Sequence, residues 1–426
     1  MTPESKSNEL AIRGGTPAIQ HPLPPMYPGG MRIGDTEEAA VLEVLRNKRL
    51  FRYYGPNPGP SKVAQLEEAF GAFMGAKYAV GVTSGTAALI CGLIGLGIGP
   101  GDEVIVPAFT WIASASAVVA VGAVPIMAEV DESLTLDPAD VERKISPYTR
   151  AILPVHMRGA PCRMDVIMEI AQRHHLKVLE DVAQADGASF HGRRLGTWGD
   201  VGAFSLQFNK IITSGEGGMV ITSDETVFKR IQMYQDVVGG QRNKIPENQI
   251  LPGVNYRMPE LLGAVALAQL QKLDELLASM RSNKAMLKQS ISEVARRKGV
   301  TFRPLHDPQG DAAICMIFFA PDINTAKRMD EALSAEGVDL WHLYSPEHSD
   351  YHVYAHWAPI MNQRTWHPNG GPWRNHPRQI TYSTDMCPRS LDLLGRAFSL
   401  DISPDLSGQN LEELADALTK VLEAVV

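Results

Sequence analysis

Apolar residues recur along the chain in two alternating patterns, one with helical spacing and one in short continuous runs. VAQLEEAFGAFM, from Val63, has apolar residues at helical spacing, and AALICGLIGLGI, from Ala87, is apolar nearly all round, which indicates a buried helix. DEVIVP, from Asp102, is rich in β-branched residues, as a buried parallel strand is. SASAVVAVGA before VPIMAEV, and VIMEIAQRHH before LKVLED, repeat this helix-then-strand unit. The alternation from residue 61 to about 235 predicts an α/β fold with a mainly parallel sheet between helices, whose ligand lies beyond the carboxyl ends of the strands.

We expect the chain to divide into three parts. Residues 1–60 are rich in Pro and Gly and are expected to wrap a surface as an N-terminal extension. Residues 61–280 form the large domain, which ends in MPELLGAVALAQLQKLDELLASMRSNKAMLKQSI, a stretch that reads as one long amphipathic helix. Residues 281–426 are less regular and are expected to form a smaller α+β domain, with many aromatic residues and histidines between Trp341 and Tyr382.

Bulk composition excludes several classes of protein. The 426 residues are 44% hydrophobic and carry a net charge of −8, which argues against nucleic acid or an anionic membrane as the main partner. The first ten residues lack a signal-peptide pattern, and the longest uncharged run, 104–128, contains two Pro and reads as strand, loop and helix rather than a membrane span. The four cysteines lie far apart and show no metal-binding spacing. We therefore predict a cytoplasmic protein with reduced core thiols and no metal site.

Three short motifs carry possible chemistry, and each has a structural alternative. Lys210 lies in FSLQFNKIITSGEGGMVIT, either as a lysine at the edge of a core strand with its charge in solvent or as a functional group. Ser84-Gly85-Thr86 precedes the buried helix, either as a simple N-cap or as a phosphate site at the helix dipole. Asp181 stands where an apolar strand stops, so it faces the ligand crevice or caps the segment that follows.

The combination of these motifs matches the requirements of a pyridoxal phosphate site. Asp181 and Lys210 are 29 residues apart, and the lysine is flanked by small and polar residues. A desolvated lysine favours the neutral amine that reacts with the cofactor aldehyde. A buried aspartate keeps the pyridine nitrogen protonated, so that the ring can accept electrons. Donors at a helix start hold the phosphate.

Six motifs in order resemble the DegT/DnrJ/EryC1/StrS family of pyridoxal-phosphate-dependent sugar aminotransferases. They are TSGTAAL, GDEVIVPAFTWIASASAV, VHMRGAPCRMD, LEDVAQADGASFHGRRLGTWGDVGAFS, NKIITSGEGGMVIT and GVNYRMPELLGAVALAQL, and the resemblance runs from about residue 35 to 280. It implies the fold type I architecture, with a seven-stranded, mainly parallel sheet in the large domain and a smaller C-terminal α+β domain.

The resemblance also implies a role for individual residues. Lys210 matches the lysine that holds the cofactor, where a dehydratase branch has histidine, and Asp181 matches the partner of the pyridine nitrogen. Gln184 matches the contact to the ring hydroxyl, and Trp111 the aromatic side chain that stacks on the ring. The phosphate contacts match Gly85, Thr86, Ala87 and Ser205, together with Asn255 from a neighbouring subunit, which implies a homodimer with shared active sites.

The family's activity implies a transaminase of amino-sugar biosynthesis with L-glutamate or L-glutamine as donor and ping-pong kinetics. The acceptor would be a keto-sugar, a cyclitol or an oxidised 3-deoxy-octulosonate, since LFRY at Leu50 and EGVDLWHLY at Glu336 resemble the octulosonate branch. An acidic acceptor would need basic residues, for which the candidates are Arg52, Arg158, His342 and His348. A sugar dehydratase or lyase using the same cofactor, and a non-catalytic regulator that binds it, are the alternatives.

Overall fold

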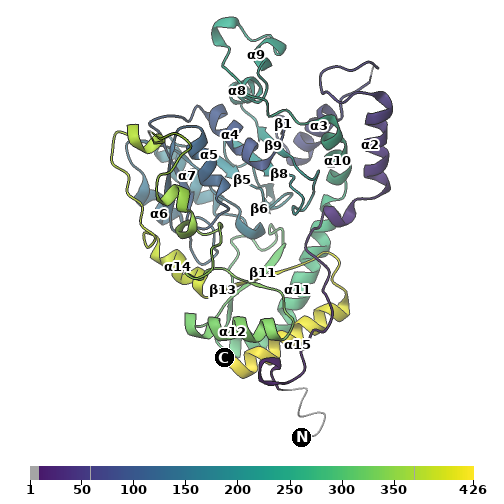
Figure 1. Ribbon diagram of the computed structural model, residues 1–426, viewed down its shortest axis with the longest axis vertical. Coiled ribbons are helices and arrows are strands. Elements are labelled where there is room, and N and C mark those ends of the chain that lie inside the picture. The colour runs from purple at the N-terminus through teal and green to yellow at the C-terminus, as the bar shows by residue number, and fades with distance from the viewer. Residues whose placement is uncertain (1–8, 58, 369) are drawn as a thin grey trace.

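The computed structural model describes residues 9–57, 59–368 and 370–426, and it contains two main sheets joined by a long helix. Figure 1 shows the large sheet with its helices in the upper part of the molecule and the small sheet with helices α11, α12 and α15 in the lower part, where the C-terminus lies. Among the described residues, no helix is both long and apolar enough to cross a membrane.

The large sheet has seven strands in the order β1-β9-β8-β5-β4-β2-β3, as expected. Only β9 runs antiparallel to its neighbours β1 and β8, and the other pairs are parallel. Its strands are β1 Tyr78–Val82, β2 Glu103–Pro107, β3 Val124–Ala128, β4 Thr149–Ile152, β5 Lys177–Asp181, β8 Val201–Ser205 and β9 Gly218–Thr222. A small hairpin, β6 Ser189–Phe190 and β7 Arg193–Arg194, follows β5.

Helices cover this sheet and bring their amino termini to the strand ends. Helices α4, α5 and α8 pack together, with α4 against β5, β8 and β9, whereas α6 and α7 pack against each other and against β3 and β5. The α-helices are α2 Asp35–Asn47, α3 Lys62–Met74, α4 Gly85–Leu96, α5 Ala113–Ala120, α6 Pro138–Lys144, α7 Met164–Arg173, α8 Glu225–Gln235, α9 Gly239–Arg242, α10 Glu260–Leu270, α11 Leu273–Arg297, α12 Ile323–Ala335, α13 Ala358–Met361, α14 Pro388–Gly395 and α15 Gly408–Val425. The 3₁₀ turns are η1 Ala11–Arg13, η2 Gly30–Arg32, η3 Met157–Gly159, η4 Glu247–Gln249, η5 Tyr354–His356 and η6 Pro372–Asn375.

The helix and strand predictions between residues 61 and 181 are confirmed, and local chemistry explains their ends. In α4 the Ser84 hydroxyl accepts the Ala87 N–H, and the helix stops at Gly97, whose φ of 81° is left-handed. The strand β2 is buried along its whole length, as expected of a central parallel strand. All four cysteines are buried and free, as predicted.

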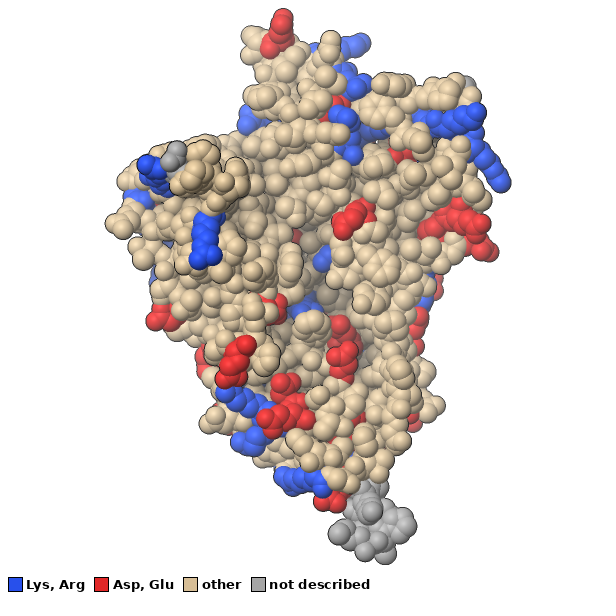
Figure 2. Space-filling view, viewed as in Figure 1, with Lys and Arg blue, Asp and Glu red and all other residues tan. Residues whose placement is uncertain are grey.

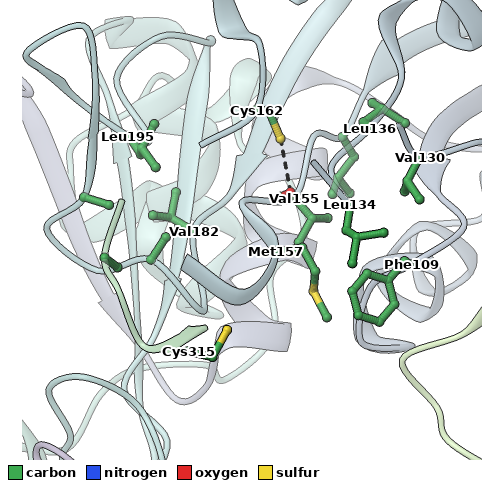
Figure 3. Packing of buried hydrophobic residues seen from close by; sticks show 14 of the residues in the cluster. Phe109, Val130, Leu134, Leu136, Val155, Met157, Cys162, Val182, Leu195 and Cys315 are labelled. Carbon is green, nitrogen blue, oxygen red and sulfur yellow. Dashed lines mark hydrogen bonds between the residues drawn. The ribbon is translucent and has the colours of Figure 1, made fainter. Parts of the chain in front are cut away.

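Close packing of apolar side chains extends from the large sheet to the small one. Figure 3 shows Phe109, Val155 and Met157 packed beside Leu134, with the Cys162 thiol donating to the Val155 carbonyl at 3.1 Å. These side chains are buried. Because Val155 and Phe109 follow β4 and β2, this core fixes the carboxyl ends of the central strands.

The small sheet is antiparallel and its order is β10-β11-β13-β12. Its strands are β10 Thr301–Phe302, β11 Cys315–Phe319, β12 Trp341–His342 and β13 Ala397–Asp401. The segment between β12 and β13 returns to the large sheet, where the Tyr382 hydroxyl donates to the Pro125 carbonyl at 2.7 Å and Arg378 pairs with Glu103 at 2.5 Å. The predicted boundary at residue 280 falls inside the continuous helix α11.

The stretch from Met258 is two helices, so the prediction of one long helix is wrong. Helix α10 ends at Leu270, and α11 begins at Leu273. At the turn between them, the Lys272 ammonium contacts the Glu37 carboxylate and the Arg32 carbonyl, which lie in the N-terminal part of the chain. These contacts with a distant segment stabilise the turn, and the spacing of apolar residues along the sequence could not have predicted them.

Candidate active site

Two adjoining cavities open at the carboxyl ends of the large sheet, on the side that faces the small sheet. They measure about 360 and 380 Å³, and both are lined by Gln184, Asn209, Lys210 and His352. The first, the inner cavity, is reached by residues that follow strands β1, β2, β5 and β8. The second, the outer cavity, is bounded by the N-terminal segment at 25–28 and by residues of the small sheet. Figure 2 shows the hollow between the upper and lower parts, with Lys and Arg atoms visible in it.

Asp181 lies buried at the end of β5, in a chain of hydroxyl groups. Its Oδ2 accepts the Ser114 hydroxyl at 2.8 Å, and the Ser114 oxygen is 2.8 Å from the Thr110 hydroxyl. Its Oδ1 accepts the Ala183 N–H at 3.1 Å. Burial raises the pKa of Asp181, and a cation bound against it would act in the opposite direction.

Lys210 lies in the loop between β8 and β9 and is partly buried. Burial lowers the pKa of Lys210, although the carboxylates of Asp186 and Asp181 act against that shift. A lysine in this setting holds more of the neutral, nucleophilic amine than an exposed one does. The simple reading of Lys210 as a strand-edge lysine does not fit its place in a loop that lines both cavities.

The amino terminus of α4 forms a cradle opposite the end of β8. A Cβ added at Gly85 would meet the Ser205 Cβ at 2.7 Å, so only glycine leaves this gap open. The first N–H groups of the helix, at Gly85 and Thr86, have no partner within the helix, and Thr86 and Ser205 line the inner cavity. The Ala87 N–H is already taken by the Ser84 hydroxyl at 3.1 Å, and the Ala87 side chain is buried.

Trp111 and Gln184 lie on the walls of the inner cavity. Trp111 is 48% exposed although Thr110 and Ser114 beside it are buried, so its ring offers a flat apolar surface to the cavity. The Gln184 amide oxygen accepts the Arg158 N–H at 3.0 Å. The Gln184 side-chain NH₂ group is therefore the part that remains to donate into the cavity.

The donor set of the inner cavity fits pyridoxal phosphate. A helix start with hydroxyl donors suits the phosphate, the Gln184 NH₂ suits the ring hydroxyl, and Trp111 suits the ring face. The buried carboxylate of Asp181 suits a protonated ring nitrogen, and Lys210 suits the aldehyde.

The structure separates the four basic candidates for substrate binding. Arg158 lines the outer cavity, where its guanidinium is 3.8 Å from the Asp401 carboxylate. Arg52 forms a bidentate pair with Glu67, away from both cavities. The His342 Nε2–H donates to the Gly395 carbonyl at 2.8 Å, and the ring stacks on Phe398. His348 is exposed, and neither histidine lines the inner or the outer cavity.

Asn255 is exposed on the surface and lines neither cavity of its own chain. It lies beside the end of α8, because the neighbouring Val254 and Tyr256 N–H groups donate to the carbonyls of Tyr234 and Gln235.

His352 lines both cavities, and sequence reasoning did not select it. Its ring centroid is 5.0 Å from that of Trp111, and its Nδ1 is 2.8 Å from Asp350 Oδ1. The one signal in the sequence is the richness in histidine between Trp341 and Tyr382, which does not single out a position.

Comparisons with known proteins agree with this geometry. The family model described as the DegT/DnrJ/EryC1/StrS aminotransferase family matches residues 31–367. GDP-perosamine synthase of Caulobacter vibrioides is 41% identical over 238 residues, which cover 55% of this chain and 63% of that protein, less than two thirds of its length. L-glutamine:2-deoxy-scyllo-inosose aminotransferase of Streptoalloteichus tenebrarius is 35% identical over 372 residues, which cover 83% of this chain and 84% of that protein. The solved structure of DesV from S. venezuelae is 32% identical, with a TM-score of 0.73 over 92% of this chain and 95% of that one.

Proposed function

The chain belongs to the DegT/DnrJ/EryC1/StrS family and is a pyridoxal-phosphate-dependent aminotransferase, and we propose that it moves an amino group from L-glutamate or L-glutamine to the carbonyl of a keto-sugar, a cyclitol or an oxidised octulosonate. The observation that carries the proposal is that Lys210 and Asp181 face one cavity beneath the start of α4. Bound pyridoxal phosphate supplies an electron sink for the carbon that loses or gains a proton.

The residues of the inner cavity then have separate tasks. Asp181 keeps the ring nitrogen protonated, and the hydroxyls of Ser114 and Thr110 orient its carboxylate. Lys210 is the base that takes the proton from the donor Cα, for which its lowered pKa suits it. Trp111 and the cradle of Gly85, Thr86 and Ser205 hold the ring in place and keep water from one face.

The outer cavity is the proposed place of the donor and acceptor, which occupy it in turn. It adjoins the inner one through Lys210, so a substrate there reaches the reacting atoms. Two relatives suggest the class of acceptor, namely GDP-perosamine synthase and L-glutamine:2-deoxy-scyllo-inosose aminotransferase. The names of both relatives refer to an amino sugar or a cyclitol, which supports an acceptor whose carbonyl lies on a polyhydroxylated ring.

A homodimer with shared sites is part of the proposal. Three apolar side chains in segments that pack near Asn255, namely Leu50, Val237 and Ile250, are 54%, 57% and 41% exposed. Leu50 belongs to this face because its carbonyl lies 3.5 Å from the Glu260 N–H, and Val237 follows the end of α8. Exposed apolar residues grouped in this way favour contact with a second copy, which would bring Asn255 to the partner's phosphate.

The test follows the two halves of the reaction separately. Purified enzyme receives L-glutamine or L-glutamate, and conversion of the cofactor to pyridoxamine phosphate is followed by absorbance with measurement of the 2-oxo acid. The pyridoxamine form then receives scyllo-inosose, 2-deoxy-scyllo-inosose, a nucleotide-linked keto-sugar or oxidised 3-deoxy-octulosonate. Formation of an aminated product supports the proposal. Consumption of a sugar without pyridoxamine phosphate formation from any donor would favour the dehydratase or lyase alternative.

A further inference from the structure

His352 lies at the junction of the two cavities, on the segment between strands β12 and β13 of the small sheet. The Thr110 and Ile112 N–H groups donate to the carbonyls of His352 and Tyr351 at 2.9 and 3.0 Å, and Tyr354 donates back to the Ala108 carbonyl. Val353, Tyr354 and Trp357 are fully buried behind it. The backbone of this segment is therefore fixed to the turn that presents Trp111.

Asp350 sets the orientation of the His352 ring. Its Oδ1 lies 2.8 Å from His352 Nδ1 and also accepts the His352 backbone N–H at 2.9 Å. Burial by itself raises the pKa of Asp350, but the hydrogen bonds from His352 and the charges of His352 and Arg158 together outweigh burial and hold the pKa below its usual value. A carboxylate on this side requires the proton on Nδ1. In the neutral ring Nε2 is then an acceptor, and it is the ring nitrogen that Asp350 does not engage, in a side chain that lines both cavities.

The walls of the outer cavity favour a neutral, hydroxyl-bearing ring. Asp339 and Asp401 line it, and their carboxylates can accept hydrogen bonds from the hydroxyls of a polyol ring. The positive charge of Arg158 is shared with Asp401, and its guanidinium lies over the Trp341 ring at 5.8 Å. Trp341 is 53% exposed, so it offers a flat apolar face to the C–H groups of a ring.

We propose that His352, oriented by Asp350, binds the acceptor, with Nε2 accepting a hydrogen bond from a ring hydroxyl of a neutral cyclic polyol ketone. This inference rests on the proposed aminotransferase function and names its acceptor class. L-Glutamate has neither a hydroxyl nor an amide N–H to offer Nε2, so with L-glutamate as donor His352 distinguishes the acceptor from the donor that uses the same cavity in turn.

The test measures the two half-reactions of the holoenzyme variants. In H352F the ring still packs against Trp111 but Nε2 is lost. We expect the pyridoxamine form of H352F to react with scyllo-inosose about tenfold less efficiently than the wild type, as expected for the loss of one hydrogen bond. The L-glutamate half-reaction should change less than about threefold. H352Q, which returns an amide oxygen near Nε2, should recover part of the loss, and D350A should fall between the wild type and H352F. H174F, at an exposed histidine after α7, is the matched control and should leave both half-reactions unchanged.

The outcomes separate this inference from the function on which it rests. Equal loss in both half-reactions of H352F, or no loss in either, would overturn the role of His352 and leave the aminotransferase intact. Preference of the wild type for oxidised 3-deoxy-octulosonate, an anion, over scyllo-inosose would overturn the neutral acceptor. Absence of any donor half-reaction in the wild type, with cofactor bound, would instead contradict the proposed function.

Discussion

A buried carboxyl group near Lys210 gives a sharp stability prediction. Asp186 lies in the turn after β5, is 1% exposed, and neither of its carboxylate oxygens has a hydrogen-bond partner among the described residues. Burial raises its pKa to about 8, although the charge of Lys210 acts against that shift. Asp181, five residues earlier, is equally buried but has two donors on its oxygens. The substitution D186N removes the ionisable group and keeps the shape of the side chain.

The magnitude and its sign follow from the two pKa values of Asp186. In the unfolded chain the group loses its proton near its ordinary value of 3.8, and in the folded chain near about 8. Between these values the folded state holds a proton that the unfolded state has released, so the stability of the wild type falls as pH rises through this window. The gap of about four pH units corresponds to an upper bound of about 6 kcal/mol at pH 8. D186N does not carry this cost, so it should equal the wild type near pH 4 and exceed it increasingly up to pH 8.

Calorimetric melting of both proteins at equal concentration between pH 5 and 9 measures this difference. The melting temperature of D186N minus that of the wild type should increase with pH and level off above pH 8. D416N, at an exposed aspartate on α15, is the matched control and should show no such trend. A D186N protein that is less stable than the wild type by the same amount at every pH would refute the reasoning, because it would mean that the Asp186 carboxylate has a favourable partner.

Three further predictions concern the active site and its surroundings. D181N should still bind the cofactor but lose about a hundredfold in the single-turnover rate with L-glutamate, since its amide cannot stabilise a protonated ring nitrogen; a rate within threefold of the wild type would count against the assignment. The inactive K210A and N255A proteins, mixed in equal amounts and allowed to exchange subunits, should recover up to about a quarter of wild-type activity. The reason is that about half of the dimers are then mixed, and each mixed dimer has one complete site. No recovery, with exchange verified by native mass spectrometry, would speak against shared sites. R52A should lower the free energy of unfolding, measured in urea, by about 3–5 kcal/mol and leave the acceptor KM unchanged, because Glu67 is left buried without its cation. R158A should raise the acceptor KM with a smaller loss of stability. The reverse pattern would contradict the placement of both arginines.

Much of the large sheet could be predicted from the sequence because its signals are local. Helix α4 is indicated by a stretch that is apolar nearly all round, by the Ser84 cap and by Gly97 at its end, and β2 is indicated by a continuous apolar run. The residues of the inner cavity were also accessible, since Asp181 and Ser205 end strands and parallel strands bring their carboxyl ends to one edge. The family motifs then singled out Lys210, Gln184 and Trp111, which the structure brings to the same cavity.

The parts that sequence reasoning missed depend on contacts between distant segments. His352 reaches the site through backbone pairing with residues 110–112, some 240 positions earlier, in a segment without helical or strand periodicity. Arg52 was a candidate because it lies in the LFRY motif and an acidic acceptor would need basic residues. Its partner Glu67 is fifteen positions away, and only the folded structure shows that Arg52 pairs with it. The turn at Lys272 likewise depends on a distant residue, because the Lys272 ammonium contacts the carboxylate of Glu37 in α2.

The central claim is that Lys210 is the covalent anchor of pyridoxal phosphate and the base of the transamination. The most direct measurement compares wild type and K210A after loading with pyridoxal phosphate, by borohydride reduction, tryptic digestion and mass spectrometry, with turnover measured in parallel. In the wild type, the phosphopyridoxyl group should be found on the peptide that carries Lys210, and K210A should take up no covalent cofactor and show no transamination. Labelling of another lysine in the wild type, or near-normal transamination by K210A, would contradict the account.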